Sequence, residues 1–198
     1  MFGGYAWSSN CISFDGATGY GQSATTVFDD TTKPYTMEIV FTHDNPDVWG
    51  MTFAQKQLGT AQGNNMEFAW SPQKDLMFRI SAGGETAVHN CINGITYDRV
   101  SSVNSTSVTY NTGKSRYVND AMLQGVKTPL GDYSYGSAES RTYSTIGCRY
   151  AGTSRSGFAK CHIYCMRFYN RILSDEERLL NYAIDVKRFG IDSKEISK

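Results

Sequence analysis

The side chains with the clearest potential for chemistry follow one another in the segment His43-Asp44-Asn45-Pro46-Asp47-Val48-Trp49-Gly50. Carboxylate and amide oxygens are the ligands that Ca²⁺ prefers in proteins, and backbone carbonyls often complete its coordination shell. Asp44, Asn45 and Asp47 are therefore candidate metal ligands. The alternative is a solvated turn in which the same side chains hydrogen-bond to the local backbone. The sequence indicates no other cofactor.

Aromatic and planar polar side chains in three loop regions are candidates for binding a glycan. Aromatic rings stack on the apolar faces of sugars, while amide and guanidinium groups hydrogen-bond to the hydroxyls. The alternative for each residue is packing in a core or at a sheet edge, because β proteins use aromatic residues throughout. The candidate ligand-binding residues are Trp49, Asn64, Asn65, Trp70, Tyr133, Tyr135 and Arg149.

Other chemistries lack the spacing that they need. Gly113-Lys114-Ser115 matches the end of a phosphate-binding P-loop, but that motif needs a further glycine where this chain has Val108. The three histidines are scattered and accompany no nucleophile at a known spacing. The five cysteines are an odd number and form no Cys-x-x-Cys pair, so we expect buried, reduced thiols and no zinc site.

Short strands joined by turns must position these candidates. The chain has 198 residues, with 19 Gly, 13 Tyr, 10 Phe and only 4 Pro, which is typical of such a β protein. Tyr35 to Phe41 alternates with period 2 and predicts a half-buried strand. In the last strand region, the spacing of Ile163, Met166 and Phe168 predicts a β-bulge near Tyr164-Cys165. Similar runs elsewhere predict strands at 11–14, 51–54, 66–70, 76–80, 86–90, 105–110, 115–118, 142–148 and 161–169.

A single helix is predicted after the strands. Ser174-Asp175-Glu176-Glu177 is a capping box, in which the first and last side chains each bind the other's backbone amide. Leu179, Leu180, Ala183 and Ile184 form an apolar stripe, and Gly190 suits the left-handed position that ends a helix. We therefore expect one domain, residues 1–198, with strands over 1–173, a helix over about 174–189 and a tail over 190–198.

Several segments resemble laminin G-like domains of the concanavalin A-like superfamily, in that family's order along the chain. Phe14-Asp15-Gly16 and the later Tyr20 resemble its opening, and Tyr35-Thr36-Met37-Glu38-Ile39-Val40-Phe41 resembles the strand that follows. Arg167-Phe168-Tyr169-Asn170-Arg171-Ile172-Leu173-Ser174-Asp175-Glu176-Glu177 resembles its closing strand and helix, the most specific match. Further matches lie at Ser107–Tyr110, Tyr117–Asp120 and Thr145–Gly147.

The resemblance implies an all-β fold, a two-sheet antiparallel jelly-roll sandwich with a short C-terminal helix. Such domains bind glycans or proteins, and some relatives are glycosidases. Those glycosidases carry a Glu-x-Asp-x-x-Glu strand, whereas Glu38 and Glu67 lack an acidic residue two positions later. We therefore expect no catalytic residues and a non-catalytic recognition module that binds glycans or mediates adhesion. The alternatives are a structural module that binds no sugar and, third, a glycoside hydrolase.

Charge and hydropathy limit the partners. Nineteen basic residues balance nineteen acidic ones, which argues against general nucleic-acid binding, and no run approaches the ~20 apolar residues of a membrane span. The first residues, Met1 to Tyr5, lack the features of a signal peptide, so we expect synthesis in the cytosol or an excised domain. The expected location is a phage virion or a bacterial surface, and the expected partners are a glycan, a surface protein or virion proteins, with oligomers allowed.

Overall fold

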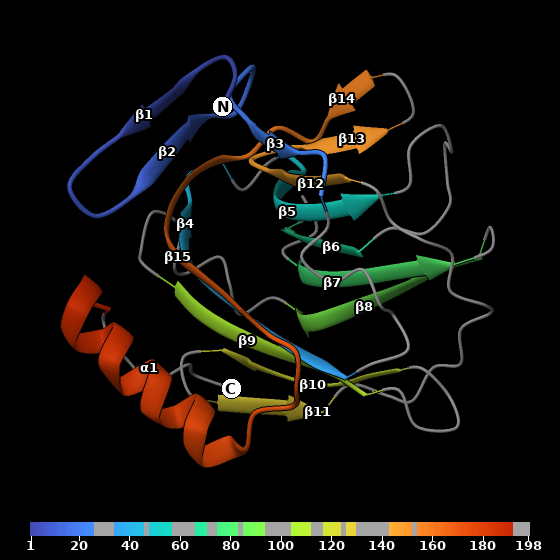
Figure 1. The fold of residues 1–198 in the computed structure, drawn as a ribbon, viewed down its shortest axis with the longest axis vertical. Coiled ribbons are helices and arrows are strands. Elements are labelled where there is room, and N and C mark those ends of the chain that lie inside the picture. The colour runs from blue at the N-terminus through green and yellow to red at the C-terminus, as the bar shows by residue number, and fades with distance from the viewer. Residues whose placement is uncertain are drawn as a thin grey trace.

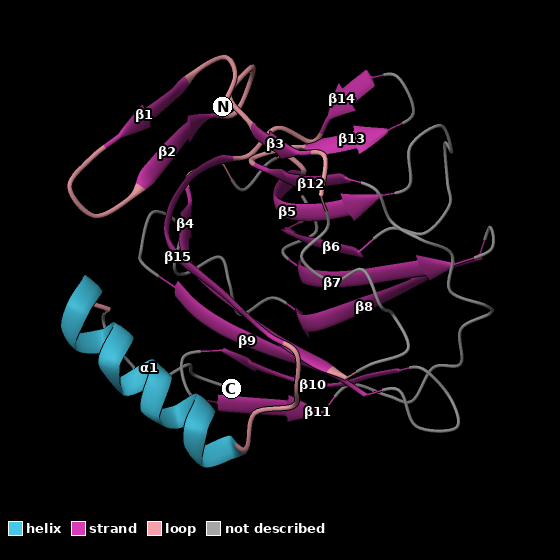
Figure 2. Cartoon of the chain, in the orientation of Figure 1, coloured by secondary structure: helices cyan, strands magenta, loops and turns pink. Residues whose placement is uncertain are grey.

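The protein folds mainly as two antiparallel β-sheets with one C-terminal helix (Figures 1 and 2). The computed structural model describes residues 1–25, 34–45, 48–56, 66–70, 75–82, 85–93, 104–111, 117–123, 126–129, 143–151 and 154–191. Everything below refers to these residues. The predicted all-β sandwich of two antiparallel sheets with a C-terminal helix is confirmed.

The first sheet has seven strands in the order β1-β2-β15-β4-β9-β10-β11. The closing strand of the chain therefore lies between two strands from its beginning. The bounds are β1 (Tyr5–Trp7), β2 (Ile12–Asp15), β15 (Lys160–Tyr169), β4 (Tyr35–His43), β9 (Asn104–Asn111), β10 (Tyr117–Leu123) and β11 (Val126–Pro129).

The second sheet has six strands in the order β3-β12-β5-β6-β7-β8. A separate two-stranded hairpin, β13 (Arg149–Ala151) and β14 (Ser154–Ser156), follows β12 along the chain. The bounds of the six strands are β3 (Gly21–Ser23), β12 (Tyr143–Ile146), β5 (Gly50–Lys56), β6 (Met66–Trp70), β7 (Asp75–Ala82) and β8 (Glu85–Asn93).

Aromatic side chains from both sheets meet to form the core. The ring of Phe41 on β4 stacks on Trp70 of β6 at a centroid distance of 6.2 Å and meets Phe68 edge-on at 5.6 Å. Phe53 of β5 contacts Phe168 of β15 at 5.0 Å. Rings of this size bury much apolar surface, so these cross-sheet contacts stabilise the sandwich.

The β-bulge predicted in β15 is confirmed. The pairing of β15 with β4 shifts between Ile163 and Cys165, so one residue is inserted at Tyr164. Ile163 is buried, and Met166 and Phe168 line an apolar cavity of about 240 Å³ beside Phe53. The bulge thus directs all three apolar side chains toward the second sheet, as the sequence spacing required.

The prediction of a half-buried strand at Tyr35–Phe41 is wrong, since all nine residues of β4 are buried. One face of β4 packs on the second sheet through Met37, Ile39 and Phe41, as expected. The other face is covered because the segment after β15 and the C-terminal helix lie across it, contacting Thr36 and Glu38.

The C-terminal helix, α1 (Asp175–Phe189), has the predicted ends. The Ser174 hydroxyl accepts from the Glu177 amide, the Glu177 carboxylate accepts from the Ser174 amide, and Gly190 is left-handed with φ +65°. In the described part of the chain, no helix has the length and apolar character needed to cross a membrane.

The apolar stripe of α1 does not pack on the sheet, which corrects the simplest interpretation of its periodicity. Leu179, Leu180 and Ile184 are exposed, Leu180 to 62%. Arg178 and Asp185 are the buried residues of the helix. The helix lies against the sheet through polar side chains because their charged and hydrogen-bonding partners are on β4 and β15.

Candidate functional site

The connection from β4 to β5 places one tryptophan at the surface and another beneath it. Trp49 is 43% exposed, whereas Trp70 on β6 is 1% exposed. A Cβ on Gly50 would lie 2.2 Å from the Trp70 ring, so the backbone passes directly over that indole and needs glycine there. The Trp70 indole N–H also donates to the Asn45 carbonyl at 3.3 Å. Trp70 therefore supports the loop that presents Trp49.

This geometry corrects the prediction for Trp70. Its ring packs against Phe41 and His43 of β4 inside the sandwich, and its one polar atom donates to the Asn45 carbonyl. It is not available for stacking on a sugar. Its position on β6 explains the difference, because Phe68 and Trp70 alternate with Glu67 and Ala69 and so point toward the other sheet.

A polar cluster lies beside this connection on the outer face of the seven-stranded sheet. The carboxylate of Asp44 is 3.4 Å from His162 Nε2, and the Asp44 amide donates to the Lys160 carbonyl at 2.8 Å. His162 Nδ1 is 2.6 Å from the Ser13 hydroxyl and 3.8 Å from the Cys11 sulfur. The cluster therefore joins the end of β4 to β15 and β2, which are adjacent strands.

The predicted Ca²⁺ ligands have other roles where the structure describes them. Asp44 faces His162, and the Asn45 carbonyl accepts from Trp70. Asp47 lies outside the described residues. Among the histidines, cysteines and carboxylates that the structure describes, no three gather in a way suited to a metal ion. The Ca²⁺ site stays a prediction.

Arg149, a predicted glycan ligand, lies beside a buried carboxylate. Its Nε is 2.8 Å from Oε1 of Glu67, which is 1% exposed on β6. Glu67 alternates with the core residue Phe68, so this ion pair lies on the outer face of the six-stranded sheet. A buried carboxylate needs a counter-ion, and Arg149 supplies it from β13. Asn64, Asn65, Tyr133 and Tyr135 lie outside the described residues, so those predictions stay untested.

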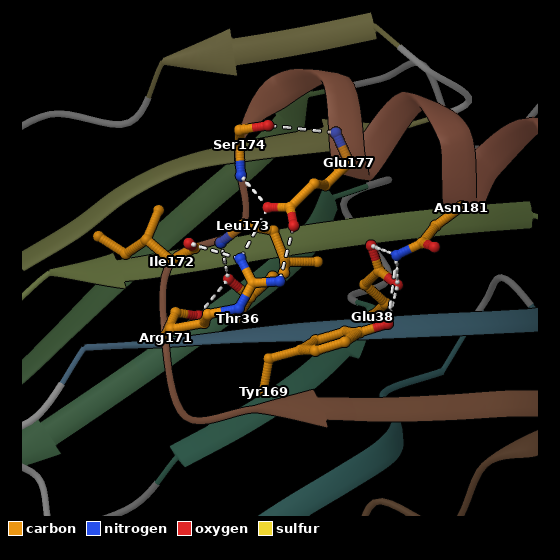
Figure 3. Close-up of polar contacts among 9 residues, drawn as sticks. All are labelled: Thr36, Glu38, Tyr169, Arg171, Ile172, Leu173, Ser174, Glu177 and Asn181. Atoms are coloured by element: carbon orange, nitrogen blue, oxygen red, sulfur yellow. Dashed lines mark hydrogen bonds and ion pairs between the residues drawn. The ribbon is translucent and has the colours of Figure 1, made fainter.

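A second polar network holds the closing segment against β4 (Figure 3). The Thr36 hydroxyl donates to the Arg171 carbonyl and accepts from the Leu173 amide, each at 2.9 Å. Glu38 accepts from Asn181 of α1 at 3.0 Å and from the Tyr169 hydroxyl at 3.4 Å. The threonine and glutamate of the β4 motif thus bind the closing motif, and both have a folding role.

The carboxylates of this network are arranged to hold the helix. Arg167 bridges Glu38 and Asp185, donating to Asp185 from both terminal nitrogens. Burial raises the pKa of Glu38, and hydrogen bonds from Asn181 and Arg167 offset part of that rise. Two carboxylates joined by one guanidinium form a structural ion pair, whereas a retaining glycosidase needs an acid and a nucleophile flanking a sugar.

Sequence reasoning missed an exposed aromatic pair and the partners of His162. Tyr5 and Trp7 lie two residues apart on the edge strand β1, and Trp7 is 69% exposed. The β1–β2 hairpin extends beyond the rest of the sandwich (Figure 1), which explains why aromatic residues at core-like spacing stay exposed. His162 and Ser13 are 149 residues apart in the sequence, so no local spacing signals their contact.

Comparison with known proteins identifies the fold but no family. No protein-family model and no curated protein sequence matches the chain. The receptor-binding domain of a botulinum neurotoxin C/D mosaic serotype superposes with a TM-score of 0.69 at 7% identity, over 94% of this chain and 46% of that one. This chain thus spans about half the length of that domain.

Two bacterial proteins from sialidases are also similar. A CBM40 of the Ruminococcus gnavus IT-sialidase has a TM-score of 0.64 at 12% identity, over 92% of this chain and 98% of that one. A further structure of that module is bound to α2,3-sialyllactose. A mutant of the NanB sialidase from Streptococcus pneumoniae has a TM-score of 0.64 at 11% identity, over 89% of this chain and 27% of that one. At these identities, the similarity shows a shared β-sandwich fold only.

Proposed function

We propose that this protein is a non-catalytic recognition module that binds glycans through the β4–β5 connection around Trp49. The main support is the structural similarity to the R. gnavus CBM40, which covers nearly the whole of both chains. A module of this size therefore suffices for carbohydrate binding in another protein. The laminin G-like motifs add support for a jelly roll of the concanavalin A-like type.

The surroundings of Trp49 support this position for the ligand. An exposed indole offers a flat apolar surface for a sugar ring. Trp70 contacts the described ends of this connection, at Asn45 through a hydrogen bond and at Gly50 through close packing. Asp44 and Asn45 belong to the same connection and carry polar side chains. Since a similar module has been solved with α2,3-sialyllactose, sialylated oligosaccharides are the first class to test.

Binding to a glycan array tests the proposal, with Trp49→Ala as the informative variant. We expect the wild-type chain to bind at least one glycan class, and Trp49→Ala to reduce that affinity roughly tenfold or more, as one aromatic contact of ~1.5 kcal/mol implies. Trp7→Ala is the matched control, because it removes another exposed tryptophan, which lies on the edge strand β1 and not in the β4–β5 connection. Loss of binding in Trp7→Ala alone would move the site to the β1–β2 hairpin. No binding to any glycan would reject the function.

A structural module that docks to virion or surface proteins is the second candidate. The exposed stripe of α1 favours it, because Leu179, Leu180 and Ile184 present an apolar face to solvent. In this case the chain forms oligomers or complexes through the helix and binds no sugar. Light scattering of the wild type and of Leu180→Glu distinguishes the two. A virion or bacterial surface is the proposed setting for both.

A further inference from the structure

Cys11 is placed beside a base, unlike the other thiols that the structure describes. It directly precedes β2 and is partly exposed. Its sulfur is 3.8 Å from His162 Nδ1, 3.9 Å from the Ser13 hydroxyl and 3.0 Å from the Ser8 hydroxyl. These distances lie within hydrogen-bonding range for sulfur, so a proton can pass from the thiol to the imidazole directly or through Ser13.

Asp44 lies at the ring nitrogen of His162 that faces away from the thiol. Its carboxylate faces Nε2 at 3.4 Å, while Nδ1 faces the thiol and the Ser13 hydroxyl. A carboxylate at one ring nitrogen favours the tautomer with its proton there and leaves the lone pair on the other nitrogen. The His162 side chain is 42% exposed, so a small reagent can reach the cluster.

The remaining described thiols lack this setting. Cys148 and Cys161 are fully buried, and burial raises the pKa of Cys148 to about 12, although Arg155 opposes the shift. Burial also raises the pKa values of Cys161 and Cys165. Thiols with raised pKa values contain little thiolate at neutral pH and react slowly.

Ser13 is a poor nucleophile despite its short contact with His162. It lies within β2, paired with Ala6 of β1 on one side and with His162 of β15 on the other. Acyl transfer needs N–H donors for the oxyanion, and amides in a sheet ladder already have acceptors. Thiol–disulfide exchange forms no oxyanion and needs no such donors, so it is the chemistry that this flat site allows.

We propose that Cys11, His162 and Asp44 form a reactive thiol site that exchanges with low-molecular-weight disulfides. His162 takes the proton of Cys11, and the thiolate attacks one sulfur of the disulfide. A new S–S bond forms as the old one breaks, and the leaving thiolate takes up a proton. The products are a mixed disulfide on Cys11 and one free small thiol, with no net oxidation.

Labelling of the full chain with the aromatic disulfide dithiobis(nitrobenzoate) tests the proposal, with each cysteine followed by peptide mass spectrometry. We expect Cys11 to react fastest of the four thiols discussed here, and His162→Gln to slow its labelling at least roughly tenfold. Asp44→Asn should slow it less, since His162 remains. Cys11→Ser should remove the fast phase.

The same experiment contains its own controls. Cys165 lies on the same strand as His162, but the charged groups that act on it are Arg167, Asp185, Arg188 and Glu38. Its labelling rate should therefore be unchanged in His162→Gln. Faster labelling of the buried Cys161 would mark a variant that has lost its fold, and His162→Asn then serves as the second variant. Equal rates for Cys11 in the wild type and in folded His162 variants would overturn the proposal, as would labelling of Cys11 no faster than in the urea-unfolded chain.

Discussion

Single side chains close the turns of this fold, and Asp15 shows how. Its carboxylate accepts from the amides of Ala17, Thr18 and Gly19 at 2.8–2.9 Å and from the Thr18 hydroxyl at 2.7 Å. Burial alone would raise the pKa of Asp15, but these four donors outweigh it and hold the pKa well below its usual range. This accounts physically for the Phe-Asp-Gly motif near the start of the chain.

Replacing Asp15 by Asn should lower the free energy of unfolding by about 1 kcal/mol at pH 7, the usual effect of losing an exposed capping side chain. A depressed pKa stabilises the fold above the unfolded value of 3.8, and this contribution is lost as pH falls below that value toward the lower pKa of the folded state. The wild type should therefore keep its advantage over Asp15→Asn down to about pH 4 and lose it progressively at lower pH. Urea unfolding at pH 7, 5, 4 and 3 checks this.

Thr18→Val is the graded control for Asp15, because it leaves the carboxylate and its three amide donors in place and removes the Thr18 hydroxyl, which donates to Asp15 and accepts from the Gly4 amide. Its loss of stability should be smaller than that of Asp15→Asn. Parallel stability curves for the wild type and Asp15→Asn across this pH range would contradict the role assigned to the carboxylate.

At the scale of elements, the sequence predicted where strands and the helix begin and end better than it predicted which residues pack against them. The main strands and the capped helix were predicted within a few residues, because alternation and capping are local signals. Strands of three residues such as β1 and β3 are too short to show a period. The docking face of α1 was also not predictable, because its partners Glu38 and Arg167 lie on distant strands. The candidate site has the same limit, because the sequence alone did not show that Trp49 is exposed while Trp70 is buried.

Substitutions on the two faces of α1 should differ in how much they lower the free energy of unfolding. Leu180→Gln and Ile184→Gln should each change the free energy of unfolding by less than about 0.5 kcal/mol, since both side chains face solvent. Asp185→Ala should lower it by about 3 kcal/mol, because Arg167 loses its main partner in a partly buried position. Denaturant titration measures all three. Large losses in the leucine and isoleucine variants with none in Asp185→Ala would mean that the apolar stripe packs on the sheet.

At the scale of the whole molecule, the contacts that join the sheets and the exposed aromatic and apolar groups lie in different parts of the fold. Phe41, Phe53 and Trp70 join the two sheets, while the connections and the helix surface carry the exposed aromatic and apolar groups. Similar sandwiches with 6–12% identity occur in neurotoxin receptor-binding domains and sialidase modules. Such divergence is compatible with one fold because a core requires apolar volume, whereas binding depends on particular surface residues.

Substitutions of the two tryptophans at the β4–β5 connection should affect different properties, namely stability for Trp70 and binding for Trp49. Trp70→Ala should lower the free energy of unfolding by about 3–5 kcal/mol, because it opens a cavity between the sheets and releases the Asn45 carbonyl. Trp49→Ala should change it by less than about 0.5 kcal/mol while weakening glycan binding. Trp70→Phe, which keeps a ring in the core but lacks the indole N–H, should be intermediate in stability.

Thermal unfolding and glycan titration on the same preparations check both properties. A stable, folded Trp70→Ala protein would show that the sheets do not depend on this contact, and a destabilised Trp49→Ala would place that ring in the core.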